Sequence, residues 1–241
     1  MPNNPSIVFV PGFWEGPTVF ESVAATLRDI YGYKTEIISL PSTGQASPEN
    51  PTLQDDIQAV HSFFERLVAS GEDVVLVLHS ASGYIGTEAI KNLTAKERMS
   101  ESKTGGVVKI VFMAAGVFPI GFKTGPLPFF EYDGARLFCK DPASFLFNDL
   151  PPDVAQMWIS RLECQPAWEW DGEITHGGYK DVSSVYLLCT NDQCVPLTMQ
   201  RKCAELAGSE TVSCDAGHMV MLSQPEMVVK VIHTAAESLR T

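Results

Sequence analysis

The sequence predicts an α/β protein with a mostly parallel sheet of about six strands and helices on both faces. Short apolar runs alternate along the chain with segments whose apolar residues recur at helical spacing. Several runs are apolar without interruption, as in VVLVL at 74–78, which is typical of strands buried on both faces. A length of 241 residues allows one such domain with a modest insertion.

Each element is expected from its own pattern. Short runs between the helical patterns predict strands at 6–11, 34–40, 73–79, 107–115 and 184–190, and a shorter strand at 210–214. Helical spacing predicts helices at 17–29, 53–69, 82–93, 197–206 and 225–239, with Thr52 as a candidate cap of the second. The polar stretch KERMSESKTGG at 96–106 reads as an exposed and mobile connection.

Residues 118–181 break the alternation of strands and helices. The segment is rich in Gly, Pro and aromatic residues, and it is too long for a loop inside a compact core. We therefore expect a core of residues 1–117 and 182–241, and a cap of short helices, 118–181, over the carboxyl ends of the strands. We expect most of its aromatic residues to pack the cap and a few to face a pocket: Phe122, Phe129, Phe130, Tyr132, Phe138, Trp158, Trp168 and Trp170.

Composition limits the classes of partner. The net charge of −12 disfavours nucleic acid and anionic membranes, so a small-molecule substrate is expected and a homodimer remains open. The first residues do not read as a signal peptide, and no run is long enough for a membrane helix, which favours a cytoplasmic protein. The six cysteines include no C-x-x-C, so we expect reduced thiols, no metal and no cofactor.

Ser80 lies where a buried strand stops and a helix begins, in the stretch VVLVLHSASGYIG at 74–86. A nucleophile elbow has this placement, although Leu78 and Ser82 occupy the two glycine positions of the usual G-x-S-x-G pattern. The alternative is a small polar residue that ends a buried strand. The choice depends on whether a histidine and a carboxylate lie at later strand ends.

A carboxylate and a histidine do follow later strands of the predicted sheet. Asp192 follows the strand at 184–190, and His218 follows the strand at 210–214. Functional groups gather at the carboxyl ends of parallel strands, and the order Ser, Asp, His is that of one large class of serine enzymes. Asp215 is the rival acid, but it shares a short loop with His218, whereas an orienting acid usually comes from another strand end. His61 and His233 lie within helices, and His79 is expected to point away from a substrate.

The chemistry requires these residue types. The hydroxyl of Ser80 needs a base, His218, to remove its proton, and Asp192 would orient the imidazole. An oxyanion hole needs two donors, for which the N–H groups of Ala81 and Phe13 are the candidates, with Trp14 in reserve. Pocket residues are expected to include Trp14, His176 and Met219.

These blocks resemble the small α/β-hydrolases of the plant methylesterase and hydroxynitrile lyase group and their microbial relatives. The similar stretches are IVFVPGFWEGPTVF, VVLVLHSASG, YLLCTNDQCVP and GHMVMLSQPEMV. The resemblance implies the α/β-hydrolase fold, the triad Ser80, Asp192 and His218, the oxyanion donors Phe13 and Ala81, and a cap that holds an apolar acyl or aromatic substrate.

The sequence also departs from that family. Pro11 replaces the usual histidine before glycine, and Met219 stands where hydroxynitrile lyases typically carry lysine. The second departure favours hydrolysis of an ester or lactone of a small, largely apolar molecule through an acyl-enzyme. Two alternatives remain: a lyase, cyclase or acyl transferase that uses the same triad, and a ligand-binding protein on a hydrolase fold.

Overall fold

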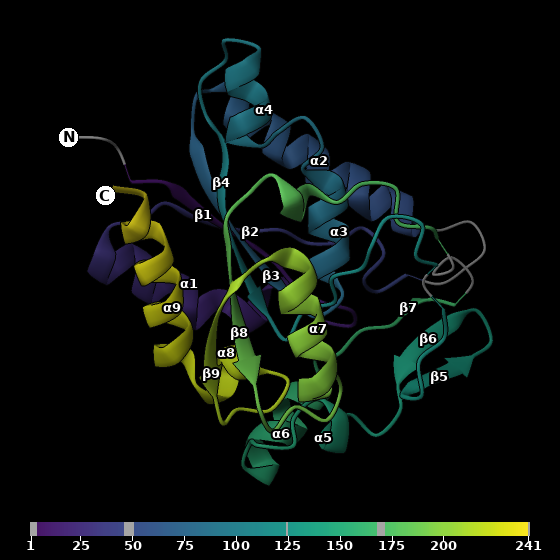
Figure 1. Cartoon of the computed structure of the whole chain (residues 1–241). Helices are drawn as coiled ribbons and strands as arrows, with labels where there is room; N and C mark the ends of the chain where they lie inside the picture. The colour runs from purple at the N-terminus through teal and green to yellow at the C-terminus, as the bar shows by residue number, and fades with distance from the viewer. Residues whose placement is uncertain (1–3, 46–50, 124, 168–171, 241) are drawn as a thin grey trace.

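A six-stranded parallel sheet forms the centre of the molecule (Figure 1). The computed structural model describes residues 4–45, 51–123, 125–167 and 172–240, so Trp168 and Trp170 lie outside the described residues. The strand order is β2-β1-β3-β4-β8-β9, and every neighbouring pair is parallel, which confirms the predicted sheet. The strands are β1 (Ser6–Val10), β2 (Thr35–Ile37), β3 (Asp73–His79), β4 (Gly106–Met113), β8 (Ser184–Cys189) and β9 (Glu210–Cys214).

The register brings the carboxyl ends of the strands to one edge of the sheet. Val10 of β1 pairs with Leu78 of β3, and His79 pairs with Met113 of β4. On the far side of β4, the last residues of β8 and β9, Cys189 and Cys214, pair with each other. The loops that follow these five strands therefore open at the same edge, where a parallel sheet places its ligand site.

Helices cover both faces of the sheet (Figure 1). α1 (Glu21–Tyr31) and α9 (Pro225–Glu237) pack against each other on one face, and α2 (Leu53–Ala69) and α3 (Ser82–Ala89) pack on the other, with α7 (Leu197–Ala207) beside them. α2 begins with a capping box between Thr52 and Asp55, as predicted for Thr52. Shorter pieces are α8 (Val220–Ser223) and the 3-10 helices Pro17–Phe20, Gly178–Lys180 and Ser238–Arg240.

The connection at 96–106 is mostly exposed, as predicted, but it contains ordered structure that the sequence did not predict. The helix α4 (Ala95–Ser100) begins there with a capping box between Thr94 and Glu97. The guanidinium of Arg98 then donates to three main-chain carbonyls, those of Val68, Thr104 and Gly105, at 2.7, 2.8 and 2.7 Å. A polar sequence thus forms ordered structure because its side chains bond the local backbone.

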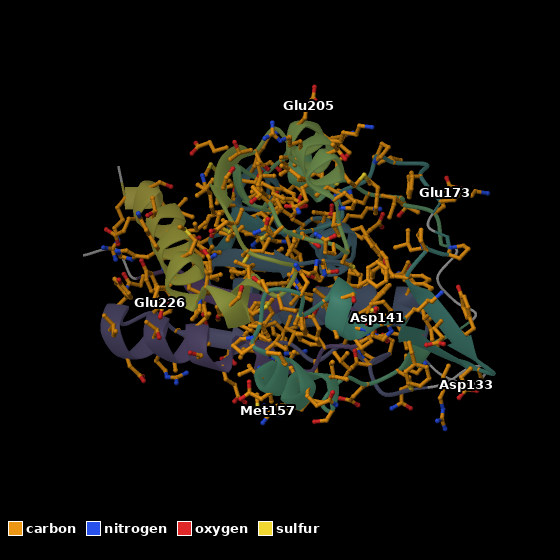
Figure 2. The ribbon with its side chains drawn as sticks, turned by 90° about the horizontal axis from the view of Figure 1, so that it is seen from below. Asp133, Asp141, Met157, Glu173, Glu205 and Glu226 are labelled. Carbon is orange, nitrogen blue, oxygen red and sulfur yellow. The ribbon has the colours of Figure 1, made fainter. Side chains whose placement is uncertain are left out.

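The inserted segment contains a second, antiparallel sheet as well as the expected short helices. Its strands are β5 (Phe130–Asp133), β6 (Arg136–Cys139) and β7 (Gln165–Pro166), and its helices are α5 (Pro142–Phe145) and α6 (Pro152–Ile159). The prediction of short helices missed this sheet, although Asp133-Gly134 between two apolar stretches is a hairpin signal. Asp133 lies at the tip of this hairpin, which projects from the body of the molecule (Figure 2).

The outer surface carries the acidic charge. Glu205 on α7 points outward at the top of the view in Figure 2, and both Glu205 and Glu226 on α9 are exposed. Within the described ranges, no helix combines the length and the apolar composition that crossing a membrane would require.

Candidate active site

Ser80 sits in a strained turn between β3 and α3. Its φ of 55° lies in the left-handed region, which costs a non-glycine residue roughly 1–3 kcal/mol. Main-chain bonds hold this conformation: the Ser80 N–H donates to the carbonyl of Met113 at 3.3 Å. Its own carbonyl accepts from Gly83 at 3.2 Å and from Gly116 at 2.9 Å. A sharp, over-determined turn of this kind presents the serine hydroxyl at the edge of the sheet.

The two departures from G-x-S-x-G are accommodated by neighbouring residues. A Cβ on Gly86, in α3, would lie 2.3 Å from Cδ2 of Leu78, so the glycine that makes room lies in the helix rather than in the strand. The Ser82 hydroxyl is fully buried, accepts from the His79 N–H at 2.7 Å and lies 2.7 Å from the carbonyl of Val10. It therefore links the elbow to β1.

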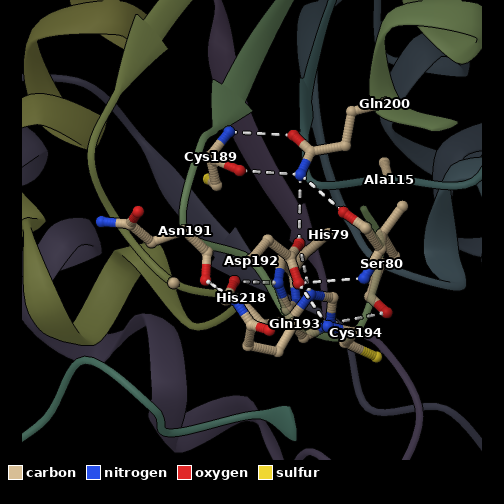
Figure 3. A network of polar contacts seen from close by, with 12 residues as sticks. His79, Ser80, Ala115, Cys189, Asn191, Asp192, Gln193, Cys194, Gln200 and His218 are labelled. Atoms are coloured by element: carbon tan, nitrogen blue, oxygen red, sulfur yellow. Dashed lines mark hydrogen bonds and ion pairs between the residues drawn. The ribbon is translucent and has the colours of Figure 1, made fainter. Parts of the chain in front are cut away.

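Ser80, His218 and Asp192 form one hydrogen-bonded chain (Figure 3). His218 Nε2 lies 3.0 Å from Ser80 Oγ, and His218 Nδ1 lies 2.9 Å from Asp192 Oδ2. His218 and Asp192 are 1% and 5% exposed, so both lie away from bulk water. Because a carboxylate only accepts, Nδ1 carries the hydrogen and Nε2 faces the hydroxyl as an acceptor.

Of the two candidate acids, Asp192 is the one that contacts His218. Its other oxygen, Oδ1, accepts from the N–H groups of Cys194 at 2.7 Å and Val195 at 2.9 Å. Asp215 is exposed, and its Oδ1 accepts from Gln224 at 2.7 Å. The loop after β8 thus supplies the partner of the imidazole, because β8 ends at the same edge of the parallel sheet as the strand before Ser80.

Gln200, which sequence reasoning missed, holds the loop that carries Asp192. It is fully buried on α7, and its amide group bonds both the N–H and the carbonyl of Cys189, at 2.8 and 2.9 Å (Figure 3). Its Nε2 also lies 3.3 Å from Asp192 Oδ2. The only sequence signal was a polar residue at a core position of an amphipathic helix.

Two residues of the inserted segment reach the same loops. Asn148 donates from Nδ2 to the carbonyl of Asn191 at 3.0 Å, and Asp149 Oδ2 accepts from the Gly217 N–H at 2.6 Å. Asn191 and Gly217 directly precede Asp192 and His218 in the chain. The segment therefore bonds the backbone beside both the acid and the base, which sequence reasoning also missed.

A cavity of about 440 Å³ opens beside Ser80. Most of its lining is aromatic or aliphatic, and none of the described residues that line it is charged. Cys194 lines it too, but burial, followed by the nearby charge of Asp192, raises the pKa of that thiol well above its usual value, so it stays protonated. The main apolar lining residues are Phe13, Trp14, Tyr84, Phe118, Phe122, Leu127, Phe129, Phe130, Phe145 and Met199.

The predicted pocket and oxyanion residues fall into two groups. Phe13, Ala81 and Trp14 line the cavity beside Ser80, and the Trp14 indole donates to the carbonyl of Leu137 in β6 at 3.0 Å. His176 and Met219 were expected in the pocket, but neither belongs to the described lining. The N–H of His176 is held by Glu88 at 2.8 Å, and Met219 is completely buried in the core.

The part of the chain that the structure describes has one group of side chains with metal-ligand character: Glu15, His79 and His218. The imidazole nitrogens already have hydrogen-bond partners. His79 bonds Glu15 and the carbonyl of His218, and His218 bonds Asp192 and Ser80. These hydrogen bonds therefore account for the close approach of Glu15, His79 and His218. The six cysteines are all free.

Comparison with known proteins identifies the family. The profile described as "Alpha/beta hydrolase family" matches residues 7–231. The protein called "Alpha/beta hydrolase nvfD" from Aspergillus novofumigatus is 33% identical over 245 aligned positions, which cover 96% of this chain and 96% of that protein. The match thus extends over nearly the full length of both chains.

Solved structures agree with this result at the level of the fold. Polyneuridine aldehyde esterase superposes with a TM-score of 0.73 at 19% identity, covering 96% of this chain and 99% of the other. The methylesterase MES16 from Arabidopsis gives a TM-score of 0.75 at 19% identity, covering 97% and 99%. With its parallel sheet, its strained serine turn and a family match that spans most of its length, this chain belongs to the alpha/beta hydrolase family.

Proposed function

We propose that this α/β-hydrolase cleaves a carboxylic ester or lactone of a small, largely apolar molecule through an acyl-enzyme formed on Ser80. The observation that carries the proposal is the hydrogen-bonded chain from Ser80 through His218 to Asp192, beside a cavity without charged side chains in its described lining. The esterases among the solved neighbours support the same class of reaction.

In the first half of the reaction, Ser80 Oγ attacks the carbonyl carbon while His218 Nε2 takes the hydroxyl proton. The imidazolium that forms is stabilised by Asp192, whose charge is in turn held by the N–H groups of Cys194 and Val195. The tetrahedral intermediate places negative charge on the former carbonyl oxygen, and the N–H groups of Ala81 and Phe13 are the proposed donors to it.

In the second half, collapse of the intermediate breaks the ester C–O bond, and His218 returns its proton to the departing alkoxide. Water then attacks the acyl carbon, His218 takes a proton from it, and the acid leaves as Ser80 regains its hydroxyl hydrogen. For a lactone, the acid and the alcohol remain one product. Residues 118–181 act as a cap in this scheme, because Phe118, Phe122 and Phe129 supply part of the cavity lining.

The apolar lining also favours hydrolysis over the cyanide chemistry of hydroxynitrile lyases. Such a lyase carries a lysine after the catalytic histidine, whereas Met219 is buried here. A cyanide leaving group would therefore meet no positive side chain among the described lining residues. An alkoxide leaving group needs only the proton from His218.

The test compares wild type with Ser80→Ala. We expect wild type to hydrolyse p-nitrophenyl esters of short and medium chain length and to be labelled by a fluorophosphonate probe, and Ser80→Ala to do neither. Loss of both in Ser80→Ala with unchanged melting temperature would assign the chemistry to the hydroxyl. A wild type that the probe does not label would exclude a serine nucleophile, and labelling without ester turnover would favour transfer or ligand binding.

A further inference from the structure

Glu15 and His79 form a second buried pair of carboxylate and histidine directly behind the first. His79 is 0% exposed and Glu15 is 2% exposed. His79 Nδ1 lies 3.0 Å from one carboxylate oxygen of Glu15 and 3.1 Å from the other. The rings of His79 and His218 have their centroids 4.7 Å apart. The reaction described above assigns no role to this pair.

The partners of His79 determine its protonation. Its Nε2 lies 2.9 Å from the carbonyl oxygen of His218, and a carbonyl can only accept. A carboxylate at Glu15 also only accepts, so these two partners suit an imidazole that carries a hydrogen on both ring nitrogens. Burial lowers the pKa of His79, but the charge and hydrogen bond of Glu15 and the bond to the His218 carbonyl raise it to a net value above the usual one. The geometry and the raised pKa of His79 both favour an imidazolium paired with a carboxylate, an ion pair with no net charge.

The same pair reaches the loop that carries Phe13. Glu15 Oε2 accepts from the Gly12 N–H at 3.1 Å. A Cβ on Gly12 would lie 2.8 Å from the Cβ of Ser80 and 3.0 Å from Glu15 Oε1, so the loop backbone is wedged between the serine and the carboxylate. Three parts of the site thus meet at one ion pair: the loop after β1, the serine turn and the backbone of His218.

We propose that the Glu15–His79 ion pair positions the reacting groups. His79 fixes the carbonyl of His218 and Glu15 fixes the N–H of Gly12, so the base and the oxyanion loop keep their places relative to Ser80. The inference rests on the proposed roles of Ser80 and His218. It has an electrostatic part as well, because loss of His79 would leave the charge of Glu15 beside the His218 ring.

The charged and titratable groups that face the two rings come from three loops. Glu15 comes from the loop after β1 and Asp192 from the loop after β8, with the Cys194 thiol close to Asp192. Asp149 bonds the N–H of Gly217, the residue before His218. The experiment below changes only the charges of Glu15 and His79 and leaves these other groups in place.

The experiment uses His79→Gln and the double variant Glu15→Gln/His79→Gln. A glutamine amide reaches the place of Nε2 and can still donate to the His218 carbonyl, and an amide oxygen at position 15 can still accept from Gly12. The single variant therefore leaves an unpaired carboxylate, whereas the double variant is neutral and keeps both bonds. His61→Gln is the matched control, because His61 Nδ1 also lies near a main-chain carbonyl, that of Ala89 at 2.7 Å, outside the site.

We expect His79→Gln to lower kcat for a p-nitrophenyl ester about 10- to 100-fold with little change in KM. The acid limb of its pH profile should move upward by about one unit, as an added negative charge within a few ångströms requires. The double variant should regain the wild-type acid limb and most of kcat, and His61→Gln should match wild type. A purely structural role would change the melting temperature and leave the acid limb in place.

A second readout does not depend on ester turnover. With histidine-selective ¹⁵N labelling, NMR follows the titration midpoint of the His218 ring in each variant, whether or not an ester is cleaved. The midpoint should rise by about one unit in His79→Gln and stay at the wild-type value in the double variant and in His61→Gln. An unchanged midpoint in His79→Gln would overturn the proposal. If that variant fails to fold, a folded double variant with kcat more than about 1,000-fold below wild type would overturn it instead.

Discussion

The two walls of the site differ in their chemistry and in their origin in the chain. The polar wall consists of Ser80, Asp192 and His218 with Glu15 and His79 behind them, and it comes from the carboxyl ends of strands of the main sheet and the turns and loops that follow them. The apolar wall includes Phe118, Phe122, Leu127, Phe129 and Phe130, all from the inserted segment 118–181. In the proposed reaction, the edge of the sheet would provide the groups for proton transfer, and the insertion, together with core residues such as Phe13 and Tyr84, would shape the substrate cavity.

Buried carboxylates also differ in their partners. On the polar wall, Asp192 and Glu15 each face a histidine. Asp56 is buried on α2, and its carboxylate is bonded by Ser42, from the N–H at 2.9 Å and the hydroxyl at 2.6 Å. Burial raises the pKa of Asp56 to about 6, although the bonds from Ser42 lower it in part. A carboxylate without a cationic partner is therefore a cost to the fold at neutral pH.

The largest expected effect tests the polar wall. Asp192→Asn should lower kcat about 10,000-fold, because an amide at this position favours the wrong imidazole tautomer and cannot stabilise the imidazolium. Asp215→Asn is the matched control, and its exposed carboxylate should be dispensable within a few-fold. Steady-state kinetics on one p-nitrophenyl ester compares the two variants. The opposite ranking would mean that Asp215 supplies the acid.

The next largest effect concerns two residues of the inserted segment that contact the polar wall instead of the cavity. Asn148 and Asp149 belong to the inserted segment, yet they bond the backbone beside Asp192 and His218. The double variant Asn148→Ala/Asp149→Ala should lower kcat about 10- to 100-fold and leave KM nearly unchanged, because it loosens the triad and not the cavity. Asp153→Ala, an exposed acid on α6, is the control. A rise in KM at constant kcat would assign Asn148 and Asp149 to substrate binding.

A smaller effect, on the free energy of unfolding, tests Asp56, whose described partners are the neutral groups of Ser42. The raised pKa means that folded Asp56 binds a proton more tightly than unfolded Asp56, so stability falls as pH rises from about 4 to about 6. Asp56→Asn keeps a neutral partner for Ser42 and should raise the free energy of unfolding at pH 7.5 by about 1–2 kcal/mol, with no gain near pH 4. Urea denaturation at several pH values measures this difference.

The neighbouring residue provides a control of opposite sign. Asp55 is exposed, and its bonds with the Thr52 N–H and hydroxyl lower its pKa below the usual value. Asp55→Asn should therefore lose stability above about pH 4, and the loss should fade as the pH falls and the wild-type carboxylate is protonated. Equal behaviour of the two variants would contradict the assignment of Asp56 as a buried, unpaired acid.

Regions with a strong local pattern were predictable from the sequence. The strands at 73–79 and 210–214 and the helix at 53–69 have the predicted bounds. For 73–79 and 53–69 the reason is local, because an apolar run and a regular helical stripe leave little choice. The placement of Ser80, Asp192 and His218 at strand ends also brought them together, since parallel strands end at one edge.

Features that depend on contacts between distant residues were not predictable. Gly86 makes room for Leu78 eight positions earlier, which requires knowing how α3 lies on β3. The bonds of Gln200, of Asn148 and of the pair Glu15 and His79 join residues from different elements, and no local spacing signals them. In the insertion, the Asp133-Gly134 turn was visible but carried less weight than the Pro-rich composition around it.

The smallest expected effect tests the apolar wall alone. Phe122 is 38% exposed, lines the cavity and stacks on Phe118 with ring centroids 4.3 Å apart. Phe122→Ala should raise KM about three- to tenfold for medium-chain esters, because the chain loses apolar contact, and should change neither kcat nor the turnover of acetate esters. Tyr132→Ala, an aromatic of the same segment that does not belong to the described lining, is the control. If Phe122→Ala lowered kcat for acetate esters as much as for longer ones, the apolar wall would act on the chemistry itself, and the separation of the two walls would not hold.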